Sequence, residues 1–229
     1  MIELKNINKI YGKDTSALTA LKNINFRLVT GANLAILGKS GSGKSTLMHV
    51  IAGLDRPSSG EVIINEVSVW AMPSKKLDEF RNKTIGFIFQ AFYLQNENTV
   101  LENVMVPLEI RGLPFNQRKA AAIEAIKALE LEDKLQRKTS ELSGGQKQRV
   151  VIARSIVGNP DIIFADEPTG NLDSVTGATV EQILFNLNKN TDVCLIVVTH
   201  DEDFAKRFDN RIMLKDGEII EMIGEGVSQ

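Results

Sequence analysis

The chain has 229 residues, 43% of them hydrophobic, and a formal net charge of -2 at pH 7. A chain of this size buries a substantial core in one or two domains. The slightly negative charge argues against a nucleic-acid partner, because nucleic-acid-binding domains usually carry a basic excess. No apolar run approaches the roughly 18 residues that cross a bilayer, and residues 1–5 lack a signal-peptide core, so we expect a cytoplasmic chain.

The N-terminal part of the sequence alternates as antiparallel strands do. We expect strands and hairpins over residues 1–30 and 61–70, with the first strand over 2–10. Asn65-Glu66 interrupts the second of these regions. Glu is strained at positive φ, so we expect a turn type here that does not demand it.

Four apolar runs, by contrast, are nearly continuous, as in parallel strands that helices cover on both faces. They lie at residues 34–37, 85–89, 162–166 and 194–198. The single cysteine, Cys194, begins the last run, so we expect it in the core, where no internal disulfide is possible.

The remaining segments have a helical or hairpin pattern. Apolar residues recur at helical spacing over 116–130, which predicts an amphipathic helix within a helical lobe at about 91–140. A second, core-packed helix is expected over 174–190. Lys215-Asp216-Gly217-Glu218 is typical of a closing hairpin turn.

Residues 38–45 match the phosphate-binding pattern G-x-x-x-x-G-K-[ST], directly after the apolar run 34–37. A strand, a glycine-rich loop and a helix in this order surround phosphates with backbone N–H groups. Lys44 would reach the β- and γ-phosphates, Ser45 would ligate Mg²⁺, and Thr46 would add a phosphate contact. The predicted nucleotide-binding residues are Tyr11, Gly38, Lys39, Ser40, Gly41, Ser42, Gly43, Lys44, Ser45 and Thr46.

Two carboxylates, Asp166 and Glu167, end the run 162–166. Beside a phosphate-binding loop, Asp166 is placed to hold Mg²⁺, through water, and Glu167 to polarise the attacking water. Pro168 and Gly170 then break the strand, as expected at the ligand-binding edge of a parallel sheet. The alternative is an acidic, solvated loop.

Polar residues end two other apolar runs in the same way. Gln90 follows 85–89 and could ligate Mg²⁺ or orient water, while His200 follows 194–199 and could donate to the γ-phosphate. Each alone is also compatible with a capping or loop residue. We interpret the other histidine, His49, as structural.

The segment Leu142, Ser143, Gly144, Gly145 and Gln146 is rarer. Good helix formers follow it, which predicts that it opens a helix. Its two glycines would let the backbone approach a phosphate, and Ser143 would add a hydroxyl donor. The alternative is an ordinary glycine turn before a helix.

In chain order, these motifs, together with Asn171-Leu172-Asp173, resemble the ATP-binding cassette of ABC transporters over nearly the whole chain. The resemblance implies an α/β fold: a P-loop NTPase core and antiparallel β subdomain over about 1–90 and 160–229, and a helical subdomain over about 91–159. It implies that Tyr11 stacks on adenine; the alternative is an edge-strand tyrosine. It also implies that residues 142–146 of one subunit close over ATP held by another, with Asp173 at that seam, so that hydrolysis requires a dimer.

The run 165–173 with 86–90 is similar to the lipoprotein-release and macrolide-exporter group. The cell-division ATPase of bacteria and amino-acid importers remain alternatives. The group implies a permease with few spans, whose coupling helix meets residues 91–106, and a peripheral position on the inner face of the cell membrane. Thr139 stands where proline is common in the family, which we expect to loosen that loop.

Three other classes fit less well. A GTPase needs an Asn-Lys-x-Asp motif, and the nearest segment, 188–191, ends in Thr. DNA-repair and chromosome-organising relatives carry long coiled-coil arms, for which the stretch between Gln90 and Leu142 is too short. Translation-associated relatives carry two cassettes, whereas this chain has one phosphate-binding loop.

Overall fold

The computed structural model describes residues 1–12 and 17–228; residues 13–16, inside the region expected to form the first hairpins, lie outside this description. The described chain divides into two compact units, 1–78 with 192–229 and 79–191. These boundaries differ from the expected subdomains at 1–90 with 160–229 and at 91–159. Helix α2 (Ser74–Thr84) contains the first boundary.

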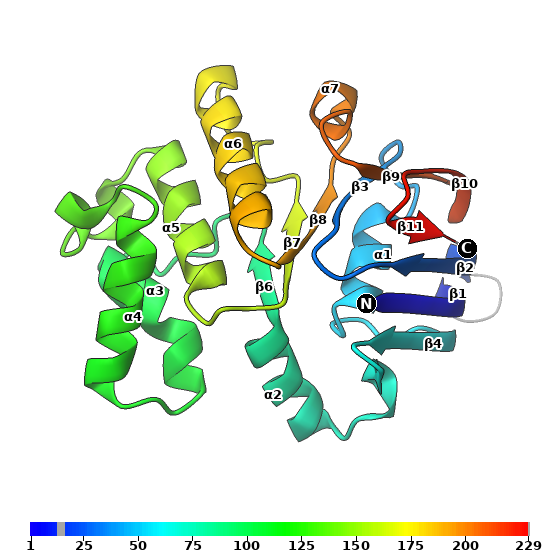
Figure 1. Cartoon of the computed structure of the whole chain (residues 1–229), viewed down its shortest axis with the longest axis horizontal. Coiled ribbons are helices and arrows are strands. Elements are labelled where there is room, and N and C mark those ends of the chain that lie inside the picture. Colours follow the sequence, from blue (N-terminus) through cyan, green and yellow to red (C-terminus); the bar gives the residue numbers. More distant parts are fainter. Residues whose placement is uncertain (13–16, 229) are drawn as a thin grey trace. The chain divides into compact units, whose positions relative to one another are not determined.

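The first unit contains an antiparallel sheet in the order β11-β2-β1-β4-β5. Four of its strands confirm the predicted antiparallel regions: β1 (Ile2–Tyr11), β2 (Leu18–Leu28), β4 (Ser59–Ile64) and β5 (Val67–Ser68) (Figure 1). The fifth, β11 (Val227–Ser228), lies outside those regions. Ile2, Leu4 and Ile7 are buried on β1. The phase of burial shifts by one residue between Leu4 and Ile7, where the β1–β2 register is irregular.

Four asparagines form this irregularity. Asn6 and Asn23 have positive φ values of 50° and 46°, which asparagine tolerates better than most residues. The Asn25 Oδ1 accepts from the Asn6 amide at 2.8 Å, and the Asn8 Oδ1 accepts from the Asn23 amide at 2.9 Å. The bulges are therefore hydrogen-bonded on both strands, and they set the register of Lys9 and Tyr11 further along β1.

The turn between β4 and β5 corrects an expectation from the sequence. Asn65 and Glu66 have φ values of 48° and 66°, as both central residues of a two-residue type I′ turn do. The turn therefore does place Glu66 in the left-handed region. The closing hairpin at Asp216-Gly217 is confirmed, with φ values of 50° and 81°.

The second group of strands in the first unit runs in the order β10-β9-β3-β8. Strand β3 (Asn33–Leu37) is parallel to both β8 (Cys194–Val198) and β9 (Asn210–Lys215), and β10 (Glu218–Ile223) closes the hairpin. All five residues of β3 and of β8 are buried, as predicted for central parallel strands. Burial raises the pKa of the Cys194 thiol to about 12.

Short helices complete the first unit: α1 (Lys44–Ile51), the 3₁₀ turn η2 (Val69–Ala71) and α7 (Glu202–Ala205). Helix α1 contacts β2 of the antiparallel sheet and β8 of the other strand group. Leu47 and Met48 on α1 are fully buried. The Lys22 amide on β2 donates to the Gly217 carbonyl, in the turn between β9 and β10, at 2.8 Å.

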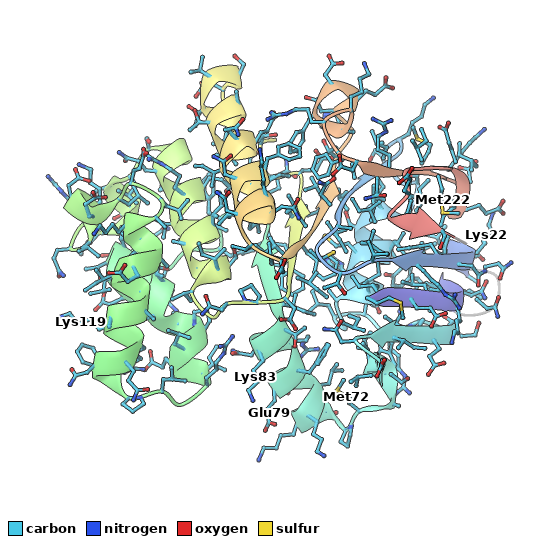
Figure 2. The ribbon with its side chains drawn as sticks, in the orientation of Figure 1. Lys22, Met72, Glu79, Lys83, Lys119 and Met222 are labelled. Atoms are coloured by element: carbon cyan, nitrogen blue, oxygen red, sulfur yellow. The ribbon has the colours of Figure 1, made fainter. Side chains whose placement is uncertain are left out.

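The second unit holds two parallel strands, β6 (Ile85–Ile88) and β7 (Ile162–Asp166). Its helices are α3 (Val100–Ile110), α4 (Phe115–Lys127), α5 (Gly144–Ile156) and α6 (Ser174–Asn190), with 3₁₀ turns η3 (Glu132–Lys134) and η4 (Thr139–Glu141). The α6 bounds match the prediction, and α4 stops short of the predicted end at 130. Helix α5 packs against α3, α4, α6 and β6 and therefore forms the centre of this unit. Lys119 points outward from α4 (Figure 2).

Thr139 does not loosen its loop. Its side chain is fully buried, its hydroxyl donates to the Gln95 carbonyl at 2.9 Å, and its amide donates to the Asn98 carbonyl at 3.0 Å. A proline would lack that amide donor. The threonine therefore fastens the loop before α5 through two bonds, and the expectation of a looser loop is wrong.

Candidate functional site

Residues 38–43 connect the buried strand β3 to helix α1. Gly38, Gly41 and Gly43 all have positive φ. A Cβ on Gly43 would lie 2.5 Å from the Ala20 carbonyl oxygen, and one on Gly38 would lie 2.3 Å from that of Leu214. Because real Cβ atoms do not approach so closely, this wrapped loop requires glycine at both positions.

The N-terminus of α1 is open. Its N-cap residue is Gly43, and no side chain in the described part of the chain caps it. The Ser42 Oγ is buried and has no hydrogen-bond partner within residues 1–12 and 17–228. Buried polar atoms rarely lack a hydrogen-bond partner. The first amides of a helix also have no partner within the helix. The loop thus presents a set of donors that fits an anion, and the chain's own residues fit the phosphates of a nucleotide.

Lys44 is the first residue of α1 and is 8% exposed. Its ammonium donates to the carbonyls of Gly38 at 2.8 Å and Lys39 at 3.0 Å. An ammonium has three protons, so two bonds to the loop leave one for a ligand. Among the described residues, no carboxylate forms an ion pair with Lys44. Its charge is therefore held at the loop, as phosphate binding requires.

Two more predicted residues belong to the first unit. Strand β8 runs parallel to β3, so His200, two residues after β8, lies at the same carboxyl edge as the loop. The Thr199 amide donates to the Ile36 carbonyl at 3.2 Å and fixes this end. Tyr11 ends β1 and lies close to Thr46 of α1. The structure thus brings the loop, Tyr11 and His200 into one unit.

The second unit brings together the other predicted groups. Strands β6 and β7 pair in parallel, from Ile85 with Ile162 to Ile88 with Ala165. Asp166 ends β7 and Gln90 follows β6 by two residues, so both lie at the same edge of this strand pair. The Asn171 amide group donates to the Gln90 carbonyl at 2.8 Å. A Cβ on Gly170 would lie 2.9 Å from the Gln90 Nε2. The loop after β7 therefore packs against the loop that carries Gln90.

Glu167 has a φ of 47°. The left-handed region costs a non-glycine residue about 1–2 kcal/mol, and such outliers cluster at functional sites. The turn holds this conformation: the Gly170 amide donates to the Glu167 carbonyl at 3.0 Å. Gln148 of α5, 1% exposed, donates to the next carbonyl, that of Pro168, at 2.7 Å.

Gln148 is a residue that the sequence analysis missed. It connects helix α5, which begins within residues 142–146, directly to the turn that carries Glu167. The only signal in the sequence is a polar residue two positions after Gln146, within a run that becomes apolar. Such a residue is usually solvent-exposed in a helix, so the pattern alone did not single it out.

Ser143 opens helix α5, as predicted. It forms a capping box: the Gln146 amide donates to the Ser143 Oγ at 3.4 Å, and the Ser143 amide donates to the Gln146 Oε1 at 3.0 Å. Leu142 is 7% exposed and anchors the start of the helix in the core. The glycine turn is therefore a true helix N-terminus.

The two glycines differ in role from what we expected. A Cβ on Gly145 would lie 2.2 Å from the Thr176 Cγ2, whereas one on Gly144 would make an ordinary 3.5 Å contact with Leu172. The first turn of α6 thus crowds Gly145 from within the same chain. The absent side chain at 145 serves packing of α5 against α6, and not only the approach of a ligand.

Asp173 caps helix α6. Its carboxylate accepts from the Thr176 amide at 3.0 Å and from the Thr176 hydroxyl at 2.7 Å. These bonds, the amide first, lower the pKa of the Asp173 carboxyl. Asp173 is therefore ionised at neutral pH. It caps the same first turn of α6 whose Thr176 faces Gly145.

The segment after Gln90 is part exposed and part core. Val100 and Leu101 are buried, whereas Tyr93 is 71% exposed and has a φ of 47°. Arg154 of α5 donates to the carbonyls of Tyr93 at 2.7 Å and Phe92 at 3.0 Å. Arg154, which is not among the predicted site residues, fixes the backbone that presents Tyr93.

Within the described residues, no helix is both long and apolar enough to cross a membrane.

Known proteins that resemble this chain identify its family. The family described as "ABC transporter" matches residues 21–170. The "Lipoprotein-releasing system ATP-binding protein LolD" of Syntrophus aciditrophicus is 45% identical over 96% of this chain and 99% of its own length. The "Uncharacterized ABC transporter ATP-binding protein MJ0796" of Methanocaldococcus jannaschii is 44% identical over 96% of this chain and 95% of its own.

Solved structures agree in fold. A "dimeric structure of a post-hydrolysis state" of the MJ0796 cassette, "bound to ADP and Pi", has a TM-score of 0.89 at 41% identity, covering 98% of both chains. The structure of cbiO1 from Clostridium perfringens has a TM-score of 0.87 at 30% identity, covering 97% of this chain and 88% of that one.

The fold and the phosphate-binding loop define an α/β nucleotide-binding ATPase, and the chain belongs to the ABC transporter family. It is an ATP-binding and ATP-hydrolysing cassette of that family.

Proposed function

We propose that this cassette hydrolyses ATP through two groups of residues, one in each unit. Lys44 and the N–H groups of residues 38–46 hold the phosphates. Glu167 polarises the attacking water, and His200 donates to the γ-phosphate. The observation that carries this proposal is the uncapped N-terminus of α1, which has a buried ammonium and, beside it in the loop, a buried Ser42 hydroxyl with no partner among the described residues.

Ser45, Gln90 and Asp166 are oxygen ligands of the type that Mg²⁺ prefers. When bound, the ion would neutralise charge on the phosphate oxygens. The Asn171 bond to the Gln90 carbonyl and the close contact of Gly170 hold the Gln90 loop in place.

Two copies of the chain assemble around two ATP molecules in this proposal. Residues 142–146 of one subunit complete the site whose phosphate-binding loop belongs to the other, with Asp173 at the seam. The dimeric MJ0796 cassette supports this arrangement. So does the accessibility of the starts of α5 and α6, where Asp173 is exposed and Gly144 and Gly145 are partly exposed.

The partner in the membrane is a permease of the lipoprotein-release or macrolide-exporter type, and the cassette lies on the inner face of the membrane. Support comes from the LolD relative, which matches almost end to end. The permease would dock on residues 91–106, where Tyr93 is exposed and Arg154 fixes the backbone. Through Gln148 and Arg154, helix α5 contacts both the Glu167 turn and this docking segment.

Replacing Glu167 by Gln tests the hydrolytic role. Loss of the base should lower turnover by about 100-fold or more, while ATP still binds and the nucleotide-bound dimer accumulates. Turnover is measured by phosphate release, and the dimer by size-exclusion chromatography with ATP. Glu141→Gln makes the same chemical change at an exposed position and should leave both unaltered. Near-normal turnover by Glu167→Gln would overturn the assignment.

A further inference from the structure

The side chain of Tyr11 contacts three residues of the first unit: Lys9, Asp55 and Thr46. It is 39% exposed at the end of β1. The Lys9 ammonium lies over the ring, 4.8 Å from its centroid. The Tyr11 hydroxyl donates to the Asp55 Oδ2. The ring is thus constrained both on its face and at its tip, although it remains accessible.

Asp55 connects this ring to the phosphate-binding helix. It follows α1 after a short turn, and its amide donates to the His49 carbonyl at 3.2 Å, in the last turn of that helix. Its Oδ1 accepts from Lys9, and its Oδ2 accepts from Tyr11. One carboxylate therefore joins the end of α1 to two residues of β1.

Lys9 needs this carboxylate. The residue is 9% exposed, and a charge so far from water requires a partner. Its ammonium bonds Asp55 and also the Arg56 carbonyl, the latter at 2.7 Å. The Lys9–Asp55 ion pair should therefore form with or without a bound ligand. Because Oδ1 of Asp55 faces Lys9, its Oδ2 is directed at Tyr11.

The protonation states agree with this geometry. Partial burial alone would raise the pKa of the Asp55 carboxyl, but hydrogen bonds from Lys9 and Tyr11 outweigh it and lower that pKa. Burial, together with the bond to Asp55, raises the pKa of the Tyr11 hydroxyl. At neutral pH the carboxylate accepts and the phenol donates.

We propose that Asp55 is the positioning residue for the base of the bound nucleotide: it orients the Tyr11 ring and fixes it relative to the phosphate-binding loop. This inference rests on the proposed role of Tyr11 as the surface on which adenine stacks. Asp55 touches no nucleotide itself; it acts through the Tyr11 hydroxyl. Base stacking is sensitive to the orientation of the aromatic plane, so a ring that rotates freely would bind the base less well.

The test compares two ligands of the full chain: ATP, which has a base, and inorganic tripolyphosphate, which lacks one. Affinities are measured by calorimetry with Mg²⁺ for Tyr11→Phe, Asp55→Ala, Asp55→Asn and the double variant. Each single loss of the hydroxyl–carboxylate bond should weaken ATP binding about five-fold, within the range that an aromatic contact supplies. The affinity for tripolyphosphate should stay unchanged.

The double variant Tyr11→Phe with Asp55→Asn should bind ATP no more weakly than Tyr11→Phe alone, because both changes remove the hydroxyl–carboxylate bond and asparagine keeps an oxygen that can accept from Lys9. Glu61→Ala removes an exposed carboxylate of the same unit and should change neither affinity. Asp55→Asn retains the size of the side chain and keeps the test possible if Asp55→Ala unfolds. Equal weakening of both ligands, additive effects in the double variant, or no effect of either Asp55 variant would overturn the inference.

Tyr11→Ala separates this inference from the proposed function. It should weaken ATP binding more than Tyr11→Phe does, again without affecting tripolyphosphate. If Tyr11→Ala left ATP affinity unchanged, the adenine-stacking role itself would fail. If only the Asp55 variants were silent, Tyr11 would stack on the base without help from Asp55.

Discussion

Two helices of this cassette begin at glycine-rich segments, one in each unit, and their N-termini differ. Helix α1 begins after Gly43 with no side-chain cap, and the Ser42 hydroxyl beside it is buried without a partner among the described residues. Helix α5 begins after Ser143 with a complete capping box. The first N-terminus therefore has no side-chain cap among the described residues, whereas the second uses two of its backbone donors in the capping box.

This difference assigns distinct tasks to the two segments. An open N-terminus with a buried ammonium binds an anion within a single chain. A capped N-terminus is stable without a ligand, so the chain can present it ready-formed to a nucleotide held elsewhere. We infer that α1 binds the phosphates first and that α5 adds its contacts on assembly.

The largest expected effect comes from removing the charge at the open terminus. Lys44→Ala should weaken ATP binding by the isolated chain about 100-fold, because a charge-assisted hydrogen bond is worth up to about 3 kcal/mol. Calorimetry with ATP measures it. Lys39→Ala removes a charge from an exposed side chain of the same loop. It should weaken ATP binding less than about three-fold, because solvent and salt screen the attraction between an exposed charge and the phosphates. Equal effects of the two variants would remove the special role of Lys44.

An intermediate effect is expected where α5 meets α6. Gly145→Ala should lower the free energy of unfolding by about 1–3 kcal/mol, because the new Cβ would meet the Thr176 Cγ2, 2.2 Å away. Urea denaturation measures it. Thr176→Ser deletes that methyl group and keeps the hydroxyl that bonds Asp173, so it should restore most of the loss in the double variant. No rescue would show that the strain lies elsewhere.

The smallest effect should come from the capped terminus. Ser143→Ala should lower the free energy of unfolding by about 1 kcal/mol, the usual value of a lost N-cap, without changing the ATP affinity of the isolated chain. Ser143→Asn retains a capping acceptor and should remain close to the parent in stability. If Ser143→Ala weakened ATP binding in the isolated chain, α5 would contact nucleotide in its own subunit.

Much of this fold follows from local patterns. Continuous apolar runs predicted β3, β6, β7 and β8, because such parallel strands are buried on both faces. Helical spacing predicted α4 and α6, because a single buried face imposes the helical period. The order of the motifs indicated the family, and the comparisons confirmed it. The roles of the individual site residues stay predictions, and the variants above test those of Glu167, Tyr11, Lys44 and Ser143.

Contacts between distant segments could not be predicted in this way. Gln148, Arg154 and Asp55 act through partners 20, 61 and 44 residues away, and no periodicity encodes such pairs. The positive φ of Glu66 and the tight bonds of Thr139 were mispredicted for a related reason. Turn geometry and loop anchoring depend on the strands and carbonyls that surround them, which tertiary structure supplies.

The most direct test of the central claim, that α1 and α5 of different subunits build one site, uses two mixed dimers isolated with two affinity tags. One combines Lys44→Ala in one subunit with Ser143→Ala in the other; the second places both changes in one subunit beside an unaltered partner. If the site is shared, the first dimer keeps one intact site and the second keeps none, so only the first should hydrolyse ATP. Activity confined to the second dimer would contradict the account.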